Sequence, residues 1–411
     1  MKSRGIPGRS RIYERFETLA TVYGTNIFWM NFYQFLNIST SLLVSVAFAR
    51  LASQSLYGQY IFVISIVSFL SLVSMPGVRT TIFRSVSQGN ESFYVDATKF
   101  TVLWSLAGIP LLLAIGLYLY STRAPVVGGS IILASVFFPF MYSLQNWKNL
   151  LKAKEEFQSF VVYETSISVT RAVLIIGLLV IQPQNLLSIL LAYFASSAIL
   201  NIYFFARSLG KVSIDGDKIE WKKESYEYTL LNLTSYTFSK MDRVLIGLFL
   251  PFNQLAIYNI AVKITDTGFK FIKSSIEAVL PGFFREEYRF SDFYPVFILL
   301  FLVPILLYPL VKYPILFLYS SKYAASVFYA QIYLFAVPFY FMAYVSGQAL
   351  VKEGLSTEVN KARIASVAVF ILSAVALIPS IGILGAVVAS LAYYPVQILF
   401  CLYYLREHQL V

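Results

Sequence analysis

The longest polar stretch between apolar segments reads RSLGKVSIDGDKIEWKKES, at residues 207–225. Six apolar segments precede it and six follow it, each about 20 residues long, which is the length with which an α-helix crosses a bilayer. Their approximate bounds are 26–49, 57–78, 100–120, 126–147, 159–182, 185–206, 226–250, 255–281, 293–313, 324–350, 362–379 and 384–405. The sequence therefore predicts an all-α membrane protein of about twelve transmembrane helices, the ninth interrupted by Pro304 and Pro309.

The composition agrees with this fold class. Of 411 residues, 58% are hydrophobic and 13% charged, whereas an ordinary soluble domain has about 25% charged residues. The single cysteine, Cys401, excludes an intrachain disulfide. The single histidine, His408, lies in the polar C-terminal tail, which argues against a histidine-based triad or zinc site. The chain also lacks the phosphate-binding loop of an ATPase. We therefore expect a protein that is not an enzyme and has no cofactor.

The basic residues set the orientation, because lysine and arginine concentrate in cytoplasmic loops. With both termini in the cytoplasm, the inner segments hold about 22 of the 32 basic residues. The outer loops then hold only Arg50, Arg123, Lys312 and Lys322. We accordingly expect a multi-pass protein of the cytoplasmic membrane. The net charge of +11 then reflects topology, and nucleic acid is not an expected partner.

The twelve spans predict a division of the chain into two halves. We expect a cytoplasmic tail at 1–25, an N-terminal six-helix lobe at 26–206, a cytoplasmic linker at 207–225, and a C-terminal six-helix lobe with a short tail at 226–411. Because each half has an even number of spans, a repeat would have parallel topology, with a substrate site between the halves. A twelve-helix bundle without a repeat is the alternative.

Charged side chains within the spans predict a cavity, because a charge at mid-bilayer is costly unless it faces protein or water. Helical spacing places such residues on one face of the fifth, seventh and eighth spans, and uncharged polar residues on the first. The basic residues are Arg171, Lys240, Arg243, Lys263, Lys270 and Lys273. The acidic residues are Glu164, Asp242, Asp266 and Glu277. The polar lining residues are Gln34, Asn37, Ser41, Asn232, Ser239 and Asn259.

Two interpretations of these charges compete. In the first they form structural ion pairs within a helix, for example Lys263 with Asp266 or Lys273 with Glu277. In the second they line a water-filled cavity. The six basic residues exceed the four acidic ones, and such a surplus suits a hydrated chamber that receives an anion better than a dry core. The sequence thus favours an anionic substrate, with phosphate as the expected group.

Three stretches resemble a known family. They are SKMDRVLIGLFLPFNQLAIYNIAVKI (Ser239 to Ile264), ARLASQSLYGQYIFVISIVSFLSLVSMPGVRTTIFRSV (Ala49 to Val86) and YPILFLYSSKYAASVFYAQIYLFAVPF (Tyr313 to Phe339). They are similar to polysaccharide biosynthesis flippases, the Wzx-like branch of the multidrug/oligosaccharidyl-lipid/polysaccharide (MOP) exporter superfamily. That family's pattern of Gly-x-Tyr at the start of the second span and an arginine after it is matched by Gly58, Tyr60 and Arg84.

The resemblance implies two six-helix lobes in a V around a central cavity. It also implies alternating access that moves a polyprenyl-diphosphate-linked oligosaccharide, a polysaccharide or O-antigen repeat unit, to the outer leaflet. By resemblance, Arg243, Lys263 and Lys270 bind the anion, and Asp242 and Asp266 serve gating or ion coupling. Coupling to an H⁺ or Na⁺ gradient stays open. The expected partners are the lipid-linked oligosaccharide and membrane lipids, with other polysaccharide assembly proteins as a further option.

Three other functions are less consistent with the sequence. A cation-coupled multidrug exporter of the same superfamily would need acidic residues in the first half of the cavity, where the spans contribute only Glu164, which we expect to pair with Arg171. A lipid II flippase usually has two further spans. A membrane-embedded polysaccharide polymerase or ligase commonly carries a long outer loop, whereas the longest one here is 313–323.

Overall fold

The structure is a computed structural model that describes the backbone of residues 7–122, 124–212, 220–284 and 290–408. Side chains are described from residue 28 onward, except at 231, 232, 235, 236, 239, 271, 274, 275, 277–284 and 291 and in the gaps between those ranges. The described residues form helices and connecting turns, without a β-strand. The all-α prediction is therefore confirmed.

The described residues between 7 and 212 form nine α-helices, which we call the N-terminal lobe. They are α1 (Pro7–Leu51), α2 (Gln54–Leu70), α3 (Gly77–Ser87), α4 (Tyr94–Leu106), α5 (Gly108–Thr122), α6 (Pro125–Tyr142), α7 (Trp147–Ala153), α8 (Phe157–Ile181) and α9 (Leu186–Leu209). Short 3₁₀ turns extend α2 (Ser71–Ser74) and α6 (Ser143–Asn146).

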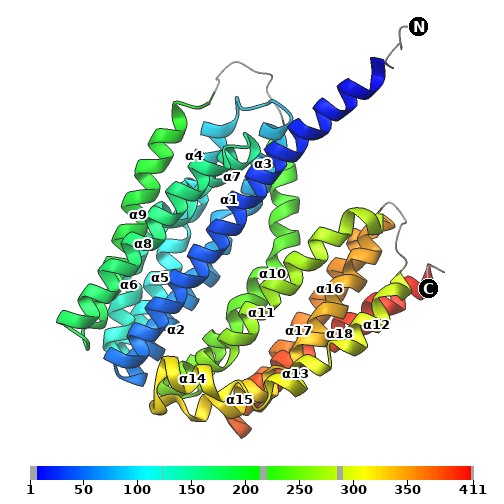
Figure 1. Cartoon of the computed structure of the whole chain (residues 1–411). Helices are drawn as coiled ribbons and strands as arrows, with labels where there is room; N and C mark the ends of the chain where they lie inside the picture. Colours follow the sequence, from blue (N-terminus) through cyan, green and yellow to red (C-terminus); the bar gives the residue numbers. More distant parts are fainter. Residues whose placement is uncertain (1–6, 123, 213–219, 285–289, 409–411) are drawn as a thin grey trace, which may run out of the picture.

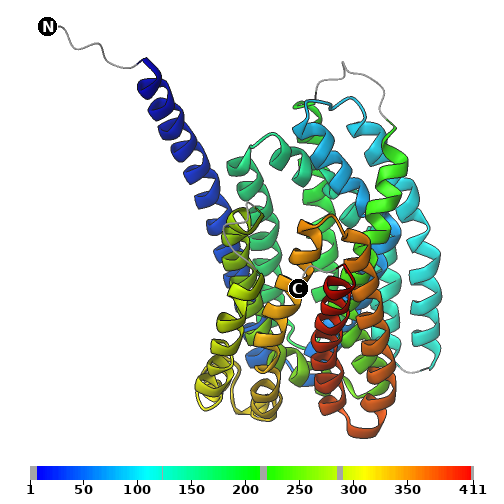
Figure 2. The same ribbon diagram turned by 90° about the vertical axis from the view of Figure 1, so that its right-hand side faces the viewer.

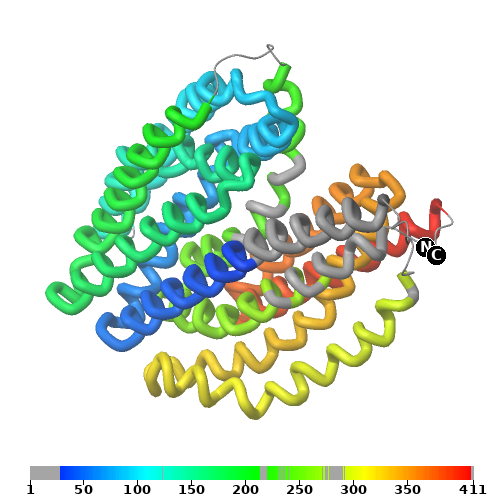
Figure 3. Tube along the Cα trace, turned by 45° about the horizontal axis from the view of Figure 1, so that its top comes forward, coloured from blue at the N-terminus to red at the C-terminus, as the bar shows by residue number. Residues whose placement is uncertain are grey.

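The C-terminal lobe contains nine further α-helices in the described residues. They are α10 (Trp221–Phe249), α11 (Phe252–Phe284), α12 (Tyr294–Leu299), α13 (Leu302–Leu307), α14 (Lys312–Tyr319), α15 (Ala325–Tyr333), α16 (Ala336–Lys352), α17 (Ser356–Ile381) and α18 (Ile383–Glu407). Figures 1 and 3 show α1–α9 as one group and α12–α18 as another, with α10 and α11 running between them. Helix α10 packs against α2, α3 and α17, and α11 against α2, α15 and α16.

Within the described residues, nine helices are long and apolar enough to cross a membrane, and the bent segment α12–α14 would be a tenth. The bend of 52° between Leu307 and Lys312 lies where the sequence predicts an interrupted ninth span. Helices α10 and α11 are not among those nine, because their charged residues make them less apolar. Their 29 and 33 residues nevertheless exceed the length that a span requires. The predicted total of about twelve is reached only when these two charged helices are counted.

Some predicted boundaries differ from the structure. The second span ends in a 3₁₀ turn at Ser74, and Met75 has a left-handed φ of 54°. This turn starts a separate helix, α3, which the hydropathy pattern alone could not resolve. Helix α10 begins at Trp221, so part of the predicted linker is helical, and residues 213–219 of it lie outside the described residues. The predicted tail lies in α1 from Pro7 onward.

The last two helices form an antiparallel pair, which Figure 2 shows side by side in orange and red. They are joined at Gly382, whose φ of +64° favours glycine because a Cβ would be strained there. At Gly385 an added Cβ would lie 2.3 Å from the carbonyl oxygen of Leu377. Glycine at these two positions therefore permits the tight reversal between α17 and α18.

The two lobes meet closely at one end, which we call the lobe junction and define by Arg50, Gln54 and Gly58. Arg50 donates to the carbonyl oxygens of Phe317 and Leu318 at the end of α14, at 2.5 and 3.0 Å. Gln54 donates to the Lys322 carbonyl at 2.6 Å. A Cβ at Gly58 would lie 1.7 Å from the Phe252 carbonyl oxygen, so the backbones of α2 and α11 are in direct contact.

Gly58→Val should open the lobe junction. The clash is with backbone and cannot be relieved by a rotamer change, so its cost should exceed the about 1–3 kcal/mol of an overpacked core. A cysteine pair at Gln54 and Lys322, in a Cys401→Ser background, reports the junction by disulfide cross-linking. We expect the cross-linked fraction to fall at least about fivefold. Gly177→Val is the matched control, because nothing lies within 4 Å of a Cβ there; equal cross-linking in the two variants would contradict the prediction.

Candidate functional site

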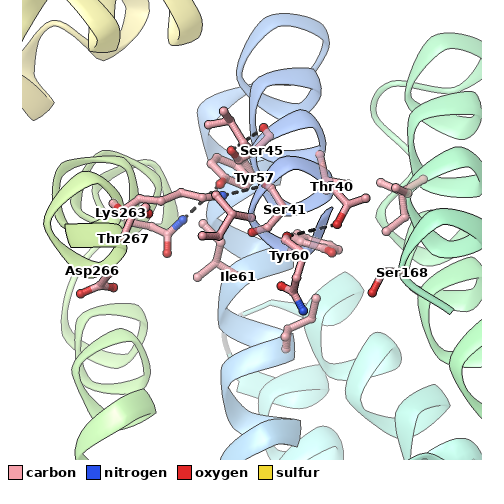
Figure 4. Close-up of a pocket in the computed structure, with 18 of the residues that line it drawn as sticks. Thr40, Ser41, Ser45, Tyr57, Tyr60, Ile61, Ser168, Lys263, Asp266 and Thr267 are labelled. Carbon is pink, nitrogen blue, oxygen red and sulfur yellow. Dashed lines mark hydrogen bonds between the residues drawn. The ribbon is translucent and has the colours of Figure 1, made fainter. Parts of the chain in front are cut away.

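A cavity of about 660 Å³ lies between the lobes. Figure 4 shows Lys263, Asp266 and Thr267 from α11 on one side, Ser168 from α8 on the other, and Ser41, Tyr57 and Tyr60 between them. Its polar and charged lining residues are Asn37, Thr40, Ser41, Ser45, Tyr57, Tyr60, Ser65, Ser168, Arg171, Tyr193, Lys240, Arg243, Asn259, Lys263, Asp266, Thr267, Lys270 and Tyr319. Seven helices from both lobes, α1, α2, α8, α9, α10, α11 and α14, thus contribute to one site.

The wall formed by α1, α2, α8 and α9 carries hydroxyl groups and aromatic rings. On α1, Thr40 donates to the Leu36 carbonyl at 2.9 Å and Ser45 to the Leu42 carbonyl at 2.8 Å. Such bonds to the preceding turn satisfy a hydroxyl hydrogen inside a membrane helix and leave its oxygen able to accept a bond from a ligand. In the described residues, Arg171 is the one charged side chain that this wall contributes to the cavity.

The opposite wall, formed by α10 and α11, is ionic. Lys263, Asp266 and Lys270 recur at spacings of three and four residues on α11, which places them on one helix face. Lys240 and Arg243 share a face of α10 in the same way. The predicted ionic faces of the two helices therefore point into one cavity.

Arg243 is the centre of a hydrogen-bonded network in this wall. Its guanidinium contacts the carboxylates of Asp242 at 3.2 Å and Asp266 at 3.1 Å, and it donates to the Asn259 amide oxygen at 3.1 Å. Asp242 also accepts a bond from the Tyr258 hydroxyl at 2.9 Å. Asn259 in turn donates to the Tyr57 hydroxyl at 3.1 Å, so the network reaches from the C-terminal lobe to α2.

The lysines of the cavity have no carboxylate partner among the described residues. Lys263 donates to the backbone carbonyl of Ser41 at 2.9 Å and forms no ion pair with a described carboxylate. Lys240 and Lys270 line the cavity without an ion pair in the described part of the chain. The cavity is net positive, because its five basic side chains (Arg171, Lys240, Arg243, Lys263 and Lys270) outnumber the carboxylates of Asp242 and Asp266.

Nine predicted site residues line the cavity, namely Asn37, Ser41, Arg171, Lys240, Arg243, Asn259, Lys263, Asp266 and Lys270. Asp242 lies behind Arg243, and Gln34 and the exposed Lys273 lie outside the lining. The side chains of Asn232, Ser239 and Glu277 fall outside the described residues.

Two ionic contacts differ from those suggested by the sequence. Glu164 shares a helix face with Arg171, but its carboxylate pairs with Lys148 of α7 at 2.8 Å. Asp266 pairs with Arg243 rather than with Lys263. In both cases the partner lies on a neighbouring helix, which spacing within one helix cannot reveal.

Sequence reasoning missed the tyrosines of the cavity. Tyr57, Tyr60 and Tyr193 line it, yet in a chain with 30 tyrosines their helical spacing is also that of ordinary packing residues. The available signal was the Gly-x-Tyr motif, which contains Tyr60 and directly follows Tyr57.

The chain matches the family model described as polysaccharide biosynthesis protein over residues 23–287, more than half of its length. Among curated protein sequences, none is significantly similar to it.

The fold is similar to several solved membrane transporters. The lipid II flippase MurJ in an inward closed conformation superposes with a TM-score of 0.71 at 15% identity, over 92% of this chain and 87% of that one. An inward-facing multidrug resistance MATE family transporter of the MOP superfamily gives 0.60 at 12% identity, over 90% and 95%. A MOP superfamily transporter from Pyrococcus furiosus gives 0.56 at 10% identity, over 93% and 96%. At these identities the likeness concerns the fold. The chain therefore belongs to the polysaccharide biosynthesis protein family and has the fold of the flippases and transporters of the MOP superfamily.

Proposed function

We propose that the protein is a flippase that moves a polyprenyl-diphosphate-linked oligosaccharide across the cytoplasmic membrane by alternating access. The observation that supports this most directly is the cavity between the lobes, where lysines without carboxylate partners face a wall of hydroxyls and aromatic rings. A diphosphate requires cations, and a sugar requires hydroxyl partners and ring faces. The family match to polysaccharide biosynthesis proteins agrees with such a substrate.

The contacts divide the anion-binding roles among the basic residues. Lys263, Lys270 and Lys240 have charges available for the diphosphate, because no described carboxylate balances them. Arg243 is held between Asp242 and Asp266, so we propose that it positions the ionic wall. The gating step would be the release of Asp266 from Arg243. Either protonation of the Asp266 carboxylate or binding of Na⁺ to it could cause this release.

The proposed transport cycle uses the two lobes as rigid bodies. If both termini lie in the cytoplasm, as the basic residues predict, the contacts of the lobe junction would close the cavity on the outer side. A volume of about 660 Å³ is within the about 300–1,000 Å³ usual for ligand pockets, enough for the diphosphate and the first sugars. The lipid tail would stay in the bilayer, since its transfer into a polar cavity would be unfavourable. The proposed activity is transport without covalent chemistry.

Deletion of the gene tests the proposal. We expect the lipid-linked oligosaccharide to accumulate on the cytoplasmic leaflet and surface polysaccharide to be lost. Arg243→Ala and Lys263→Ala should fail to restore export, whereas Lys99→Ala should restore it, because Lys99 pairs with Asp96 on the exposed surface. Surface polysaccharide in a deletion strain can be measured with a lectin or antibody. Normal export would refute the proposed function, and sensitivity of the deletion strain to cationic dyes would favour a multidrug exporter instead.

A further inference from the structure

Arg171 occupies a second cationic position in the cavity, apart from the lysines. It lies on α8, one helical turn after Ser168, and both residues line the cavity. Figure 4 shows Ser168 across the cavity from Lys263 and Asp266. The Arg171 guanidinium and the α11 lysines therefore approach a ligand from opposite walls.

No described carboxylate is paired with Arg171. Glu164, two turns earlier on the same helix, is engaged by Lys148 at 2.8 Å. The guanidinium of Arg171 instead lies over the ring of Tyr193 of α9, 4.8 Å from its centroid. A cation–π contact orients a guanidinium but leaves its net charge in place. Glu164 also acts electrostatically on Arg171, but Lys148 shares that single carboxylate, so the two basic side chains leave an excess of positive charge. At membrane depth such an excess is costly, and an anionic group of a ligand is the expected partner.

The surroundings of Arg171 are those of a sugar-binding site. Tyr60 and Tyr193 line the cavity with aromatic rings, one face of Tyr193 being covered by Arg171 itself. Ser168 and Thr40 add hydroxyls to the same lining. A pyranose ring can pack its C–H face on tyrosine and exchange hydrogen bonds with hydroxyls. A planar guanidinium binds carboxylate or phosphate with two parallel hydrogen bonds. Because the lysines of the opposite wall are available for the diphosphate, a sugar carboxylate is the second anion that Arg171 would meet.

We propose that Arg171 binds the carboxylate of an acidic sugar, so that the transported glycan carries a uronic acid or similar sugar close to its lipid diphosphate. The inference rests on the proposed flippase function and deepens it. The substrate then bridges two anion subsites, its diphosphate on the α10–α11 lysines and its sugar carboxylate on Arg171. One guanidinium balances one carboxylate, and the cluster of lysines balances the multiply charged diphosphate.

Binding measurements on the purified full chain in nanodiscs test this inference. The probes are two short-chain polyprenyl diphosphate disaccharides that differ in one group, a glucuronate carboxylate or its uncharged glucuronamide. We expect the wild-type protein to bind the glucuronate about tenfold more tightly, the size of one charge-assisted contact. Arg171→Gln should abolish this preference while still binding the glucuronamide at the wild-type affinity. Arg171→Lys, which keeps the charge but not the planar fork, should retain part of the preference.

Two controls keep the interpretation specific. Arg207→Gln is matched, because Arg207 is an exposed arginine that also lies over a tyrosine ring, Tyr163 at 5.9 Å, but outside the cavity. It should keep the tenfold preference. Lys263→Gln should weaken binding of both probes by the same factor, since both carry the diphosphate. Unchanged melting temperatures would show that each variant is folded.

The outcomes separate this inference from the proposed function. Equal wild-type affinity for glucuronate and glucuronamide would overturn the Arg171 assignment, as would a preference that survives in Arg171→Gln or a loss of both probes in that variant. A third probe, the same glucuronamide disaccharide on a neutral lipid without diphosphate, tests the flippase proposal itself. If it binds as well as the diphosphate probe, the proposed diphosphate recognition is wrong.

Discussion

Substituting both Lys263 and Lys270 by glutamine should reduce the rate of substrate translocation at least about hundredfold. Each lysine is a cavity cation without a described carboxylate partner, and a charge-assisted hydrogen bond to phosphate contributes about 1.5–3 kcal/mol. Glutamine keeps a polar side chain of similar length, so the fold should be retained. The rate can be measured in proteoliposomes with a fluorescent short-chain polyprenyl diphosphate oligosaccharide and a membrane-impermeant quencher.

The matched control for this double variant is Lys99→Gln with Lys361→Gln. Both residues are exposed lysines that pair with a carboxylate three residues away, at 3.4 and 3.6 Å, and neither lines the cavity. The control should translocate at the wild-type rate. Wild-type translocation by the Lys263–Lys270 double variant would exclude these lysines as the anion site.

Arg243→Leu should destabilise the protein more than any other single substitution in the cavity. The side chain of Arg243 is 15% exposed and engages Asp242 and Asp266. Its removal leaves two carboxylates without their cation, and breaking a buried ion pair in this way costs about 3–5 kcal/mol. We expect a large drop in the yield of monodisperse protein in detergent and in its melting temperature.

A neutral version of the network distinguishes charge imbalance from lost packing. The triple variant Asp242→Asn, Arg243→Leu, Asp266→Asn removes both orphaned charges and should recover much of the melting temperature. Arg84→Leu is the control, because Arg84 also pairs with a carboxylate, Glu224, but is 57% exposed; its melting temperature should stay close to that of the wild type. A triple variant as unstable as Arg243→Leu would show that the cost comes from packing rather than charge.

The features that follow from one helix at a time were predictable from the sequence. The spans follow from apolar length. The ionic face of α10 follows from the spacing of Lys240 and Arg243, and that of α11 from the spacing of Lys263, Asp266 and Lys270. The net positive cavity follows from the surplus of basic residues over acidic ones. These inferences depend on local periodicity and on the cost of charge in a bilayer, and neither requires knowledge of the packing.

The features that depend on two helices at once were not predictable. The partner of Asp266 is Arg243 of α10, and the partner of Glu164 is Lys148 of α7. Those choices are made by the packing of neighbouring helices, which a single sequence does not contain. The same holds for the close approach of Gly58 to Phe252. The sequence marks Gly58 as part of a Gly-x-Tyr pattern but does not indicate which backbone it contacts.

At the lobe junction, the contacts of Arg50 depend on a side chain of α1 but only on backbone atoms of α14, so the two helices differ in which substitutions these contacts tolerate. Arg50 recognises α14 through the carbonyl oxygens of Phe317 and Leu318, and Gln54 contacts a backbone carbonyl as well. Every amino acid, proline included, supplies a carbonyl, so the identities of the residues that accept these bonds are free to drift. The side-chain identity that these hydrogen bonds require therefore resides in Arg50 and Gln54, whereas Phe317, Leu318 and Lys322 can be replaced without loss of the bonds.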